Sequence, residues 1–233
     1  MKRNLVVLFA LLVSVSAFSQ AVKDRQVIPV AVNLNQVLRM TITNGGNIEF
    51  VFNSIDEYRD GLSADAATSG SANPAGSDGF YQTDFTIASS TRWKITYGSE
   101  QATFIGTDNP GHTLELDNVG FVLVNNGTHA FEAAGQPQTT TVGSSLFSAP
   151  TNNSADVTAL QVYPVDLIVD NDDVTVSNAG DSDENSFSLL WRCGTGEDSG
   201  VTAMATESLL NQNPSPTPDR YVTNVLFELS VDN

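Results

Sequence analysis

The chain has 233 residues, with 27 acidic and 10 basic side chains and a formal net charge of −17 at pH 7. This balance makes nucleic acid and anionic membrane surfaces poor partners, because both are bound by clustered lysine and arginine. The one cysteine, Cys193, cannot form an internal disulfide, and a chain of this length buries a sufficient core without one.

The first nineteen residues have the organisation of a secretion signal. Lys2 and Arg3 precede a largely apolar stretch of thirteen residues over 5–17, and the small residues Ala17 and Ser19 precede a cut before Gln20. Thirteen residues span about 20 Å as a helix, short of the ~30 Å hydrocarbon core of a bilayer. We therefore predict a signal peptide over 1–19 and a mature chain that works in the periplasm, at the cell surface or outside the cell.

Alternation of apolar and polar residues dominates the mature chain and predicts many short strands. Asn44-Gly45-Gly46 predicts a hairpin turn between two of them. In chain order, the predicted strands are 27–32, 37–43, 48–52, 80–88, 92–97, 102–105, 113–116, 119–124, 159–169, 174–177, 186–191 and 220–231.

Helical signals are few. Ser54 as N-cap with Glu57 three positions later predicts one capped turn over 54–60, and 203–210 is the only further candidate. The small and polar residues over 62–79 predict a long surface loop.

This pattern is typical of an all-β fold, an antiparallel β-sandwich of the immunoglobulin-like or jelly-roll-like kind. We expect one elaborated domain over 20–233, with long loops and at most one or two short helices. Two smaller sandwiches meeting near 143–153 are the alternative.

Two acidic clusters are candidates for structural calcium, which prefers six to eight oxygen ligands. Both have carboxylates at alternating positions but lack the glycine and distal glutamate of an EF-hand loop. Charged, solvated turns are the competing interpretation, and no other cofactor is expected. The candidate ligands are Asp170, Asp172, Asp173, Asp181 and Asp183.

Catalytic patterns are weak. The two histidines, His112 and His129, lie in no motif with a nucleophile, and the chain has no G-x-S-x-G element. Three histidine and cysteine residues, all dispersed, do not form a zinc pattern. We therefore predict that the protein is not an enzyme.

Exposed aromatic residues on a sandwich could bind carbohydrate or another ligand. The candidates are Tyr58, Tyr81 and Trp93. Trp93 and Trp191 both lie within apolar strand patterns, however, so burial is the competing expectation for each.

Two segments resemble strands of WxL-type and spore-coat-U-like surface domains. One is Ser89-Ser90-Thr91-Arg92-Trp93-Lys94-Ile95-Thr96-Tyr97, and the other is Pro218-Asp219-Arg220-Tyr221-Val222-Thr223-Asn224-Val225-Leu226-Phe227. The resemblance implies a secreted β-sandwich subunit of a coat, fibre or cell-surface layer, without catalysis.

The functional hypothesis is a secreted, non-enzymatic structural or adhesive protein, able to polymerise by strand addition. Residues 20–33 are the candidate donor segment, because they become apolar at Val27; a first strand of the protein's own sheet is the alternative. The expected partners are further copies of the chain or other surface proteins. The second hypothesis is a carbohydrate- or ligand-binding module, with glycans as partners.

Overall fold

The computed structural model describes residues 26, 28–64, 81–129, 147–148, 157–169, 177–196 and 202–232. The chain divides into two units, Met1–Asn35 and Gln36–Asn233. In the first unit, the described residues 26 and 28–35 have no regular secondary structure, so the strand predicted over 27–32 does not form there. All helices and strands described below belong to the second unit.

The largest sheet has five strands in the order β1 (Leu38–Asn44), β3 (Gln82–Ser89), β11 (Ser186–Cys193), β7 (Val119–Asn125) and β8 (Phe147–Ser148). Two short strands complete it: β2 (Leu62–Ser63) pairs with β11, and β9 (Thr158–Ala159) pairs with β7. Its described pairings are antiparallel except that of β7 with β8.

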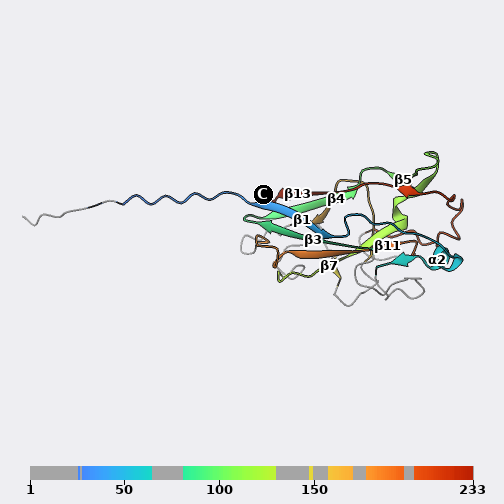
Figure 1. Cartoon of the computed structure of the whole chain (residues 1–233), viewed down its shortest axis with the longest axis horizontal. Coiled ribbons are helices and arrows are strands. Elements are labelled where there is room, and N and C mark those ends of the chain that lie inside the picture. Colours follow the sequence, from blue (N-terminus) through green and yellow to red (C-terminus); the bar gives the residue numbers. More distant parts are fainter. Residues whose placement is uncertain are drawn as a thin grey trace, which may run out of the picture. The chain divides into compact units, whose positions relative to one another are not determined.

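A second sheet has the order β10 (Val165–Ile168), β4 (Trp93–Ser99) and β13 (Val225–Val231). A small third sheet consists of β12 (Tyr221–Val222), β5 (Thr103–Gly106) and β6 (Thr113–Glu115). A short 3-10 helix, η2 (Leu116–Asn118), connects β6 to β7. Figure 1 shows this small sheet and helix α2 (Ile55–Asp60) at the same end of the second unit. Strands from both sides of 143–153 share the two larger sheets.

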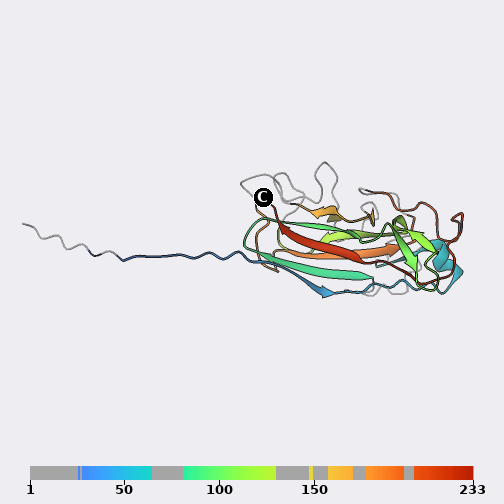
Figure 2. The ribbon, with the colours of Figure 1, turned by 90° about the horizontal axis from the view of Figure 1, so that it is seen from above.

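The two larger sheets face each other across an aromatic core, as the alternating residues predict. Trp93 of β4 contacts Phe187 of β11 with ring centroids 6.0 Å apart, and Tyr97 contacts Phe121 of β7 at 5.2 Å. Figure 2 shows the long strands of the two sheets running side by side through this part of the chain. The prediction of an all-β sandwich is therefore confirmed.

Strand β7 is buried on both faces. Phe121 and Leu123 point into the main core, whereas Val122 and Val124 pack with Ala159 and neighbouring apolar residues on the opposite face. This double burial explains why the sequence of β7 is continuously apolar while β3 alternates.

Helix α2 confirms the predicted capping box. The Ser54 hydroxyl accepts the Glu57 N–H at 3.2 Å, and the Glu57 carboxylate accepts the Ser54 N–H at 2.9 Å. The helix is therefore stabilised by local contacts before any packing is considered.

The predicted hairpin, with strands over 37–43 and 48–52 joined by a turn at 44–46, is wrong. Residues Ile48, Phe50 and Phe52 do pack against the core, as their alternation indicates, but they form no strand. The partner of β1 is instead β3, forty residues further along, with Met40 opposite Ile87. A contact so distant in sequence cannot be inferred from a local turn signal.

The helix predicted over 203–210 is also wrong. Met204 and Leu209 are both buried, but they are five residues apart, a spacing that does not keep side chains on one helix face. The backbone instead bonds two separate segments, with Ala205 N–H donating to the Asp117 carbonyl and Leu210 N–H donating to the Tyr58 carbonyl.

Two long predicted strands are interrupted. The 159–169 segment divides into the end of β9 and β10, and the 220–231 segment divides into β12 and β13. The predicted strand over 174–177 and most of the loop over 62–79 lie outside the described residues. None of the helices in the described part of the chain has the length and hydropathy needed to cross a membrane.

Candidate functional site

Trp93 does not form a ligand platform. It is the first residue of β4, its side chain points into the core, and its exposed fraction is 0%. Its Nε1–H donates to the Asn178 carbonyl at 2.7 Å. The competing expectation of burial is confirmed for Trp93 and for Trp191, so the proposed sugar-binding role of Trp93 is corrected.

Tyr58 and Tyr81 are half-buried beside two phenylalanines of the 48–52 segment. Phe50 stacks on Tyr81 with centroids 4.5 Å apart, and Phe52 contacts Tyr58 at 5.2 Å. The rings therefore contact aromatic side chains of the same chain. Trp93 is on another element and buried, so the three predicted ligand-binding aromatics do not form one exposed surface.

The aspartates predicted to bind calcium are only partly described. Asp170, Asp172 and Asp173 lie outside the described residues. Asp181 and Asp183 are exposed, and the Asp181 carboxylate accepts the N–H groups of Asp183 at 2.9 Å and Glu184 at 3.3 Å. Within the described ranges, no three His, Cys, Asp or Glu side chains gather as metal ligands. Calcium binding stays a prediction.

The two histidines and the cysteine occupy separate environments. His112 Nδ1 lies 2.9 Å from Asp219 Oδ2, and its Nε2 lies 3.1 Å from the Asn109 amide. His129 Nδ1 lies 3.0 Å from Asn185. Cys193 belongs to the apolar core, where burial raises the pKa of its thiol to about 12. A thiol with that pKa is no nucleophile at neutral pH.

Asp219 connects two chain segments through hydrogen bonds to its carboxylate. Its carboxylate accepts N–H groups of Asp108 at 3.0 Å, Asn109 at 3.1 Å and Arg220 at 2.7 Å, in addition to its contact with His112. The backbone hydrogen bond from Asp108 is the largest cause that lowers the pKa of this carboxyl to about 2. The hydrogen bonds of the Asp219 carboxylate thus hold the turn between β5 and β6 against the residues that precede β12.

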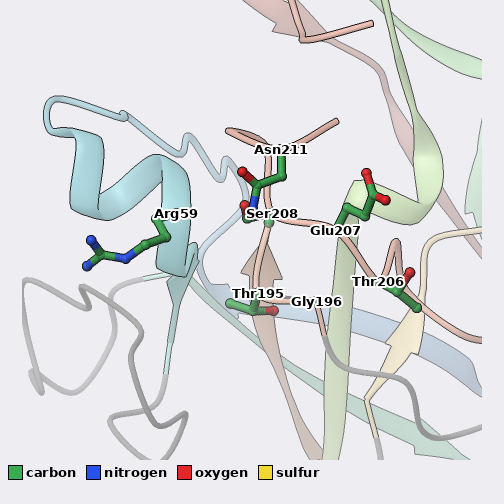
Figure 3. A pocket seen from close by; sticks show the side chains of 8 residues that line it. Arg59, Thr195, Gly196, Thr206, Glu207, Ser208 and Asn211 are labelled. Atoms are coloured by element: carbon green, nitrogen blue, oxygen red, sulfur yellow. The ribbon is translucent and has the colours of Figure 1, made fainter. Parts of the chain in front are cut away.

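One shallow pocket lies between α2 and the 194–211 segment (Figure 3), with a volume of about 400 Å³. Arg59 faces Asp56 and Asp60 at 2.9 Å, and Figure 3 shows its guanidinium directed away from the other labelled side chains. The pocket therefore offers neutral polar groups and the Glu207 carboxylate. It is lined by Arg59, Gly194, Thr195, Gly196, Thr206, Glu207, Ser208 and Asn211.

A different feature of the chain exposes apolar side chains. In the first unit, the alternate residues Ile28, Val30, Val32 and Leu34 are 82%, 84%, 76% and 91% exposed. They alternate along the extended residues 28–34, which overlap the candidate donor residues 20–33 and extend one residue beyond them. We call residues 28–34 the donor segment. Single exposed apolar residues are ordinary, but four at strand spacing form a surface that typically contacts a partner.

The second unit has a free sheet edge with an apolar inner face. Strand β1 ends the largest sheet, and within the described ranges no strand pairs with its outer edge. Met40 and Ile42 lie opposite the core residues Ile87 and Phe85, so they face the inside of the sandwich. Ile42 is nevertheless 49% exposed.

The edge strand of the opposite sheet, β13, is in contact with β1. We call the space between their inner faces the β1–β13 seam. Its side chains are partly buried for Leu38 and Met40 of β1 and for Val225, Phe227 and Leu229 of β13, whereas Ile42 of β1 is exposed. The sequence indicated both strands, but not that they lie in contact.

Comparisons with known proteins found no family model that matches the chain and no matching curated protein. The functional proposal below therefore rests on the sequence and the geometry.

Proposed function

We propose that the protein is a secreted, non-enzymatic structural or adhesive protein that assembles through strand addition by its donor segment. The single observation that carries this proposal is the exposure of four alternating apolar side chains over 28–34. An extended segment of this kind binds a sheet edge through main-chain hydrogen bonds and buries alternate side chains.

The free energy gained by burying the four apolar side chains can be compared with the free-energy cost of association. Burial of a large aliphatic side chain contributes about 1.5–3 kcal/mol, so four contribute about 6–12 kcal/mol. Association costs about 4–15 kcal/mol in lost freedom of the two molecules. The two ranges overlap, so introducing one charge on this face is expected to abolish assembly.

Secretion is the second part of the proposal, and its support is the sequence of residues 1–19. Without Lys2 and Arg3, the mature chain has 27 acidic and 8 basic side chains, hence a net charge of −19. Mass spectrometry of the protein recovered from the periplasm or the medium should give an N-terminus at Gln20. Recovery of the uncut chain from the cytoplasm would contradict this part.

The assembly test compares two neighbouring substitutions that add the same charge. Val32→Asp places a carboxylate on the apolar face, and Asn33→Asp places one on the other face. We expect the wild type and Asn33→Asp to associate in light scattering and Val32→Asp to be monomeric. A wild type that stays monomeric at all accessible concentrations, or a Val32→Asp variant that assembles normally, would refute the proposal.

A further inference from the structure

We infer that the donor segment of one copy adds to strand β1 of a second copy, antiparallel and reciprocally, and that the product is a closed two-fold dimer. This inference rests on the proposed function and identifies its acceptor, its strand direction and its symmetry. It predicts a different assembly from an open fibre.

The hydrogen bonds of β3 show which β1 residues face the free edge. The Val37 carbonyl accepts the Ser90 N–H at 2.9 Å, whereas the N–H groups of Ile87 and Ser89 donate away from β1, to Asn185 and Gly180. Because backbone direction alternates along a strand, residues 37, 39 and 41 bond β3. The N–H and C=O groups of Leu38, Met40 and Ile42 therefore point away from β3, toward the free edge of the sheet.

These same three residues carry the inner-face side chains of β1. Met40 and Ile42 lie opposite Ile87 and Phe85, both fully or almost fully buried. A strand that bonds the free groups of β1 thus extends the sheet over the β1–β13 seam. In an antiparallel pair, each residue directly opposite Met40 or Ile42 places its side chain on that inner face.

Pro29 determines which edge of the donor segment can bond. Proline has no N–H, so it is tolerated in a strand only where its backbone faces away from the partner. Residues of the same parity, Ala31 and Asn33, then also face away. The bonding residues are Ile28, Val30, Val32 and Leu34, which carry the apolar side chains.

The direction of the added strand follows from which residues can form hydrogen bonds at the edge of β1 and which can do so in the donor segment. In an antiparallel pair, bonding residues lie directly opposite each other, so the apolar side chains share a face with Met40 and Ile42. In a parallel pair, a bonding residue lies opposite one that faces away, here Arg39 or Thr41. The apolar side chains would then lie on the outer face with exposed Arg39. Only the antiparallel pairing covers the seam.

Antiparallel pairing of this region is reciprocal by geometry. The donor segment and β1 each have seven residues in one continuous stretch, 28–44. Full overlap places Leu34 opposite Leu38, Val32 opposite Met40 and Val30 opposite Ile42. The same ladder then pairs each donor segment with the other copy's β1, around a two-fold axis at Gln36. Such an interface is closed and adds no further subunits.

The charge of this stretch permits two copies to approach. The whole chain has 27 acidic side chains, yet residues 28–44 contain none, and Arg39 is their only charged residue. Like-charge repulsion between two acidic molecules is therefore reduced where the ladder forms. This local composition favours a second copy as the occupant of the edge.

A cysteine at the axis tests the inference. In the dimer, the two Gln36 residues form a hydrogen-bonded pair with Cα atoms about 5.5 Å apart, within disulfide range. Gln36 is exposed, and its side-chain amide donates to Thr91 Oγ1 at 3.1 Å in an exposed contact, so Gln36→Cys should fold. Thr43→Cys is the control, because the two Thr43 residues would lie about 46 Å apart along the ladder.

We expect the wild type to be a dimer by light scattering and Gln36→Cys to form a disulfide-linked dimer on oxidation, without cross-linking of Thr43→Cys. Adding Val32→Asp should abolish the cross-link. The buried Cys193 should not interfere.

Other outcomes separate the two proposals. Val32-dependent open filaments without the Gln36 cross-link would overturn the β1 acceptor and leave strand addition standing. Assembly that does not depend on Val32 would refute strand addition itself. A monomer at every concentration, with amides of 28–34 protected from exchange, would show that the segment folds onto its own chain and would overturn the dimer.

Discussion

Asn178 encloses the main chain of Trp93. Its Oδ1 accepts the Trp93 N–H at 3.0 Å, its Nδ2 donates to the Trp93 carbonyl at 2.7 Å, and its own carbonyl accepts the indole N–H at 2.7 Å. Both residues are 0% exposed. Since β4 begins at Trp93, this pair satisfies polar groups that would otherwise be buried without partners.

Asn178→Ala is therefore expected to destabilise the fold strongly. It leaves the Trp93 N–H and C=O buried without their side-chain partner, at about 1–3 kcal/mol each. Urea unfolding should show a loss of roughly 2–5 kcal/mol in the free energy of unfolding. The exposed Asn211 provides a matched control, because Asn211→Ala should change the free energy by less than about 0.5 kcal/mol. Equal effects of the two substitutions would contradict the role given to Asn178.

Adjacent glycines after β1 should differ in their tolerance of alanine. Gly45 has a φ of +64°, and a Cβ there would lie 1.8 Å from the Gln82 carbonyl oxygen, whereas a Cβ at Gly46 meets nothing within 4 Å. We expect Gly45→Ala to lower the free energy of unfolding by at least about 1 kcal/mol and Gly46→Ala to have little effect. Thermal unfolding of both variants would check this, and a tolerant Gly45 would contradict the close approach of β1 to β3.

Stability is expected to fall in alkaline solution. Burial raises the pKa values of Tyr97 and Cys193 to about 12, from 10.0 and 9.0. The unfolded chain loses these protons first, so their contribution to stability is complete below pH 9 and is lost as pH rises to 12. Tyr97→Phe should make the decline less steep, and Tyr163→Phe should not. An unchanged slope in Tyr97→Phe, measured by urea unfolding at several pH values, would contradict this explanation.

Acid should weaken the fold through Asp219. Its pKa is lowered from 3.8 to about 2, so its contribution is present above pH 3.8 and is lost as pH falls through 2. Asp219→Asn presents an amide where three N–H groups donate, and we expect lower stability at neutral pH with a smaller change between pH 4 and 2. Asp183→Asn, at an exposed position, is the control. Circular dichroism during acid titration measures both, and identical acid profiles would refute the role of Asp219.

The sequence predicted individual strands better than it predicted their partners. Alternation located β3 and β4 closely, because side chains on one face of a strand must be apolar to bury against the other sheet. The Ser54–Glu57 capping box was also predictable, since every contact in it lies within four residues. The hairpin predicted from 37–43 and 48–52 does not form, because the alternation over 48–52 also describes an apolar segment that packs on the core without pairing as a strand.

For the candidate site, the sequence identified the residues but not which of them are exposed. The apolar alternation over 28–34 is visible in the sequence, and so are Tyr58, Tyr81 and Trp93. Whether such side chains are buried depends on what lies opposite them: Trp93 is enclosed by Asn178 and Phe187, while Val32 is 76% exposed. Burial is a property of the packed chain, so residue type alone could not separate the two.

By itself, the sequence determined the all-β class, the acidic surface, the absence of an internal disulfide and the positions of most strands. These follow from composition and from contacts between near neighbours, which a linear pattern records. Only the tertiary structure decided that β1 ends a sheet within the described residues, that Ile42 on this edge strand is exposed and that Cys193 is buried. Those features depend on which distant segments pair, and the residues next to one another in the sequence do not specify that pairing.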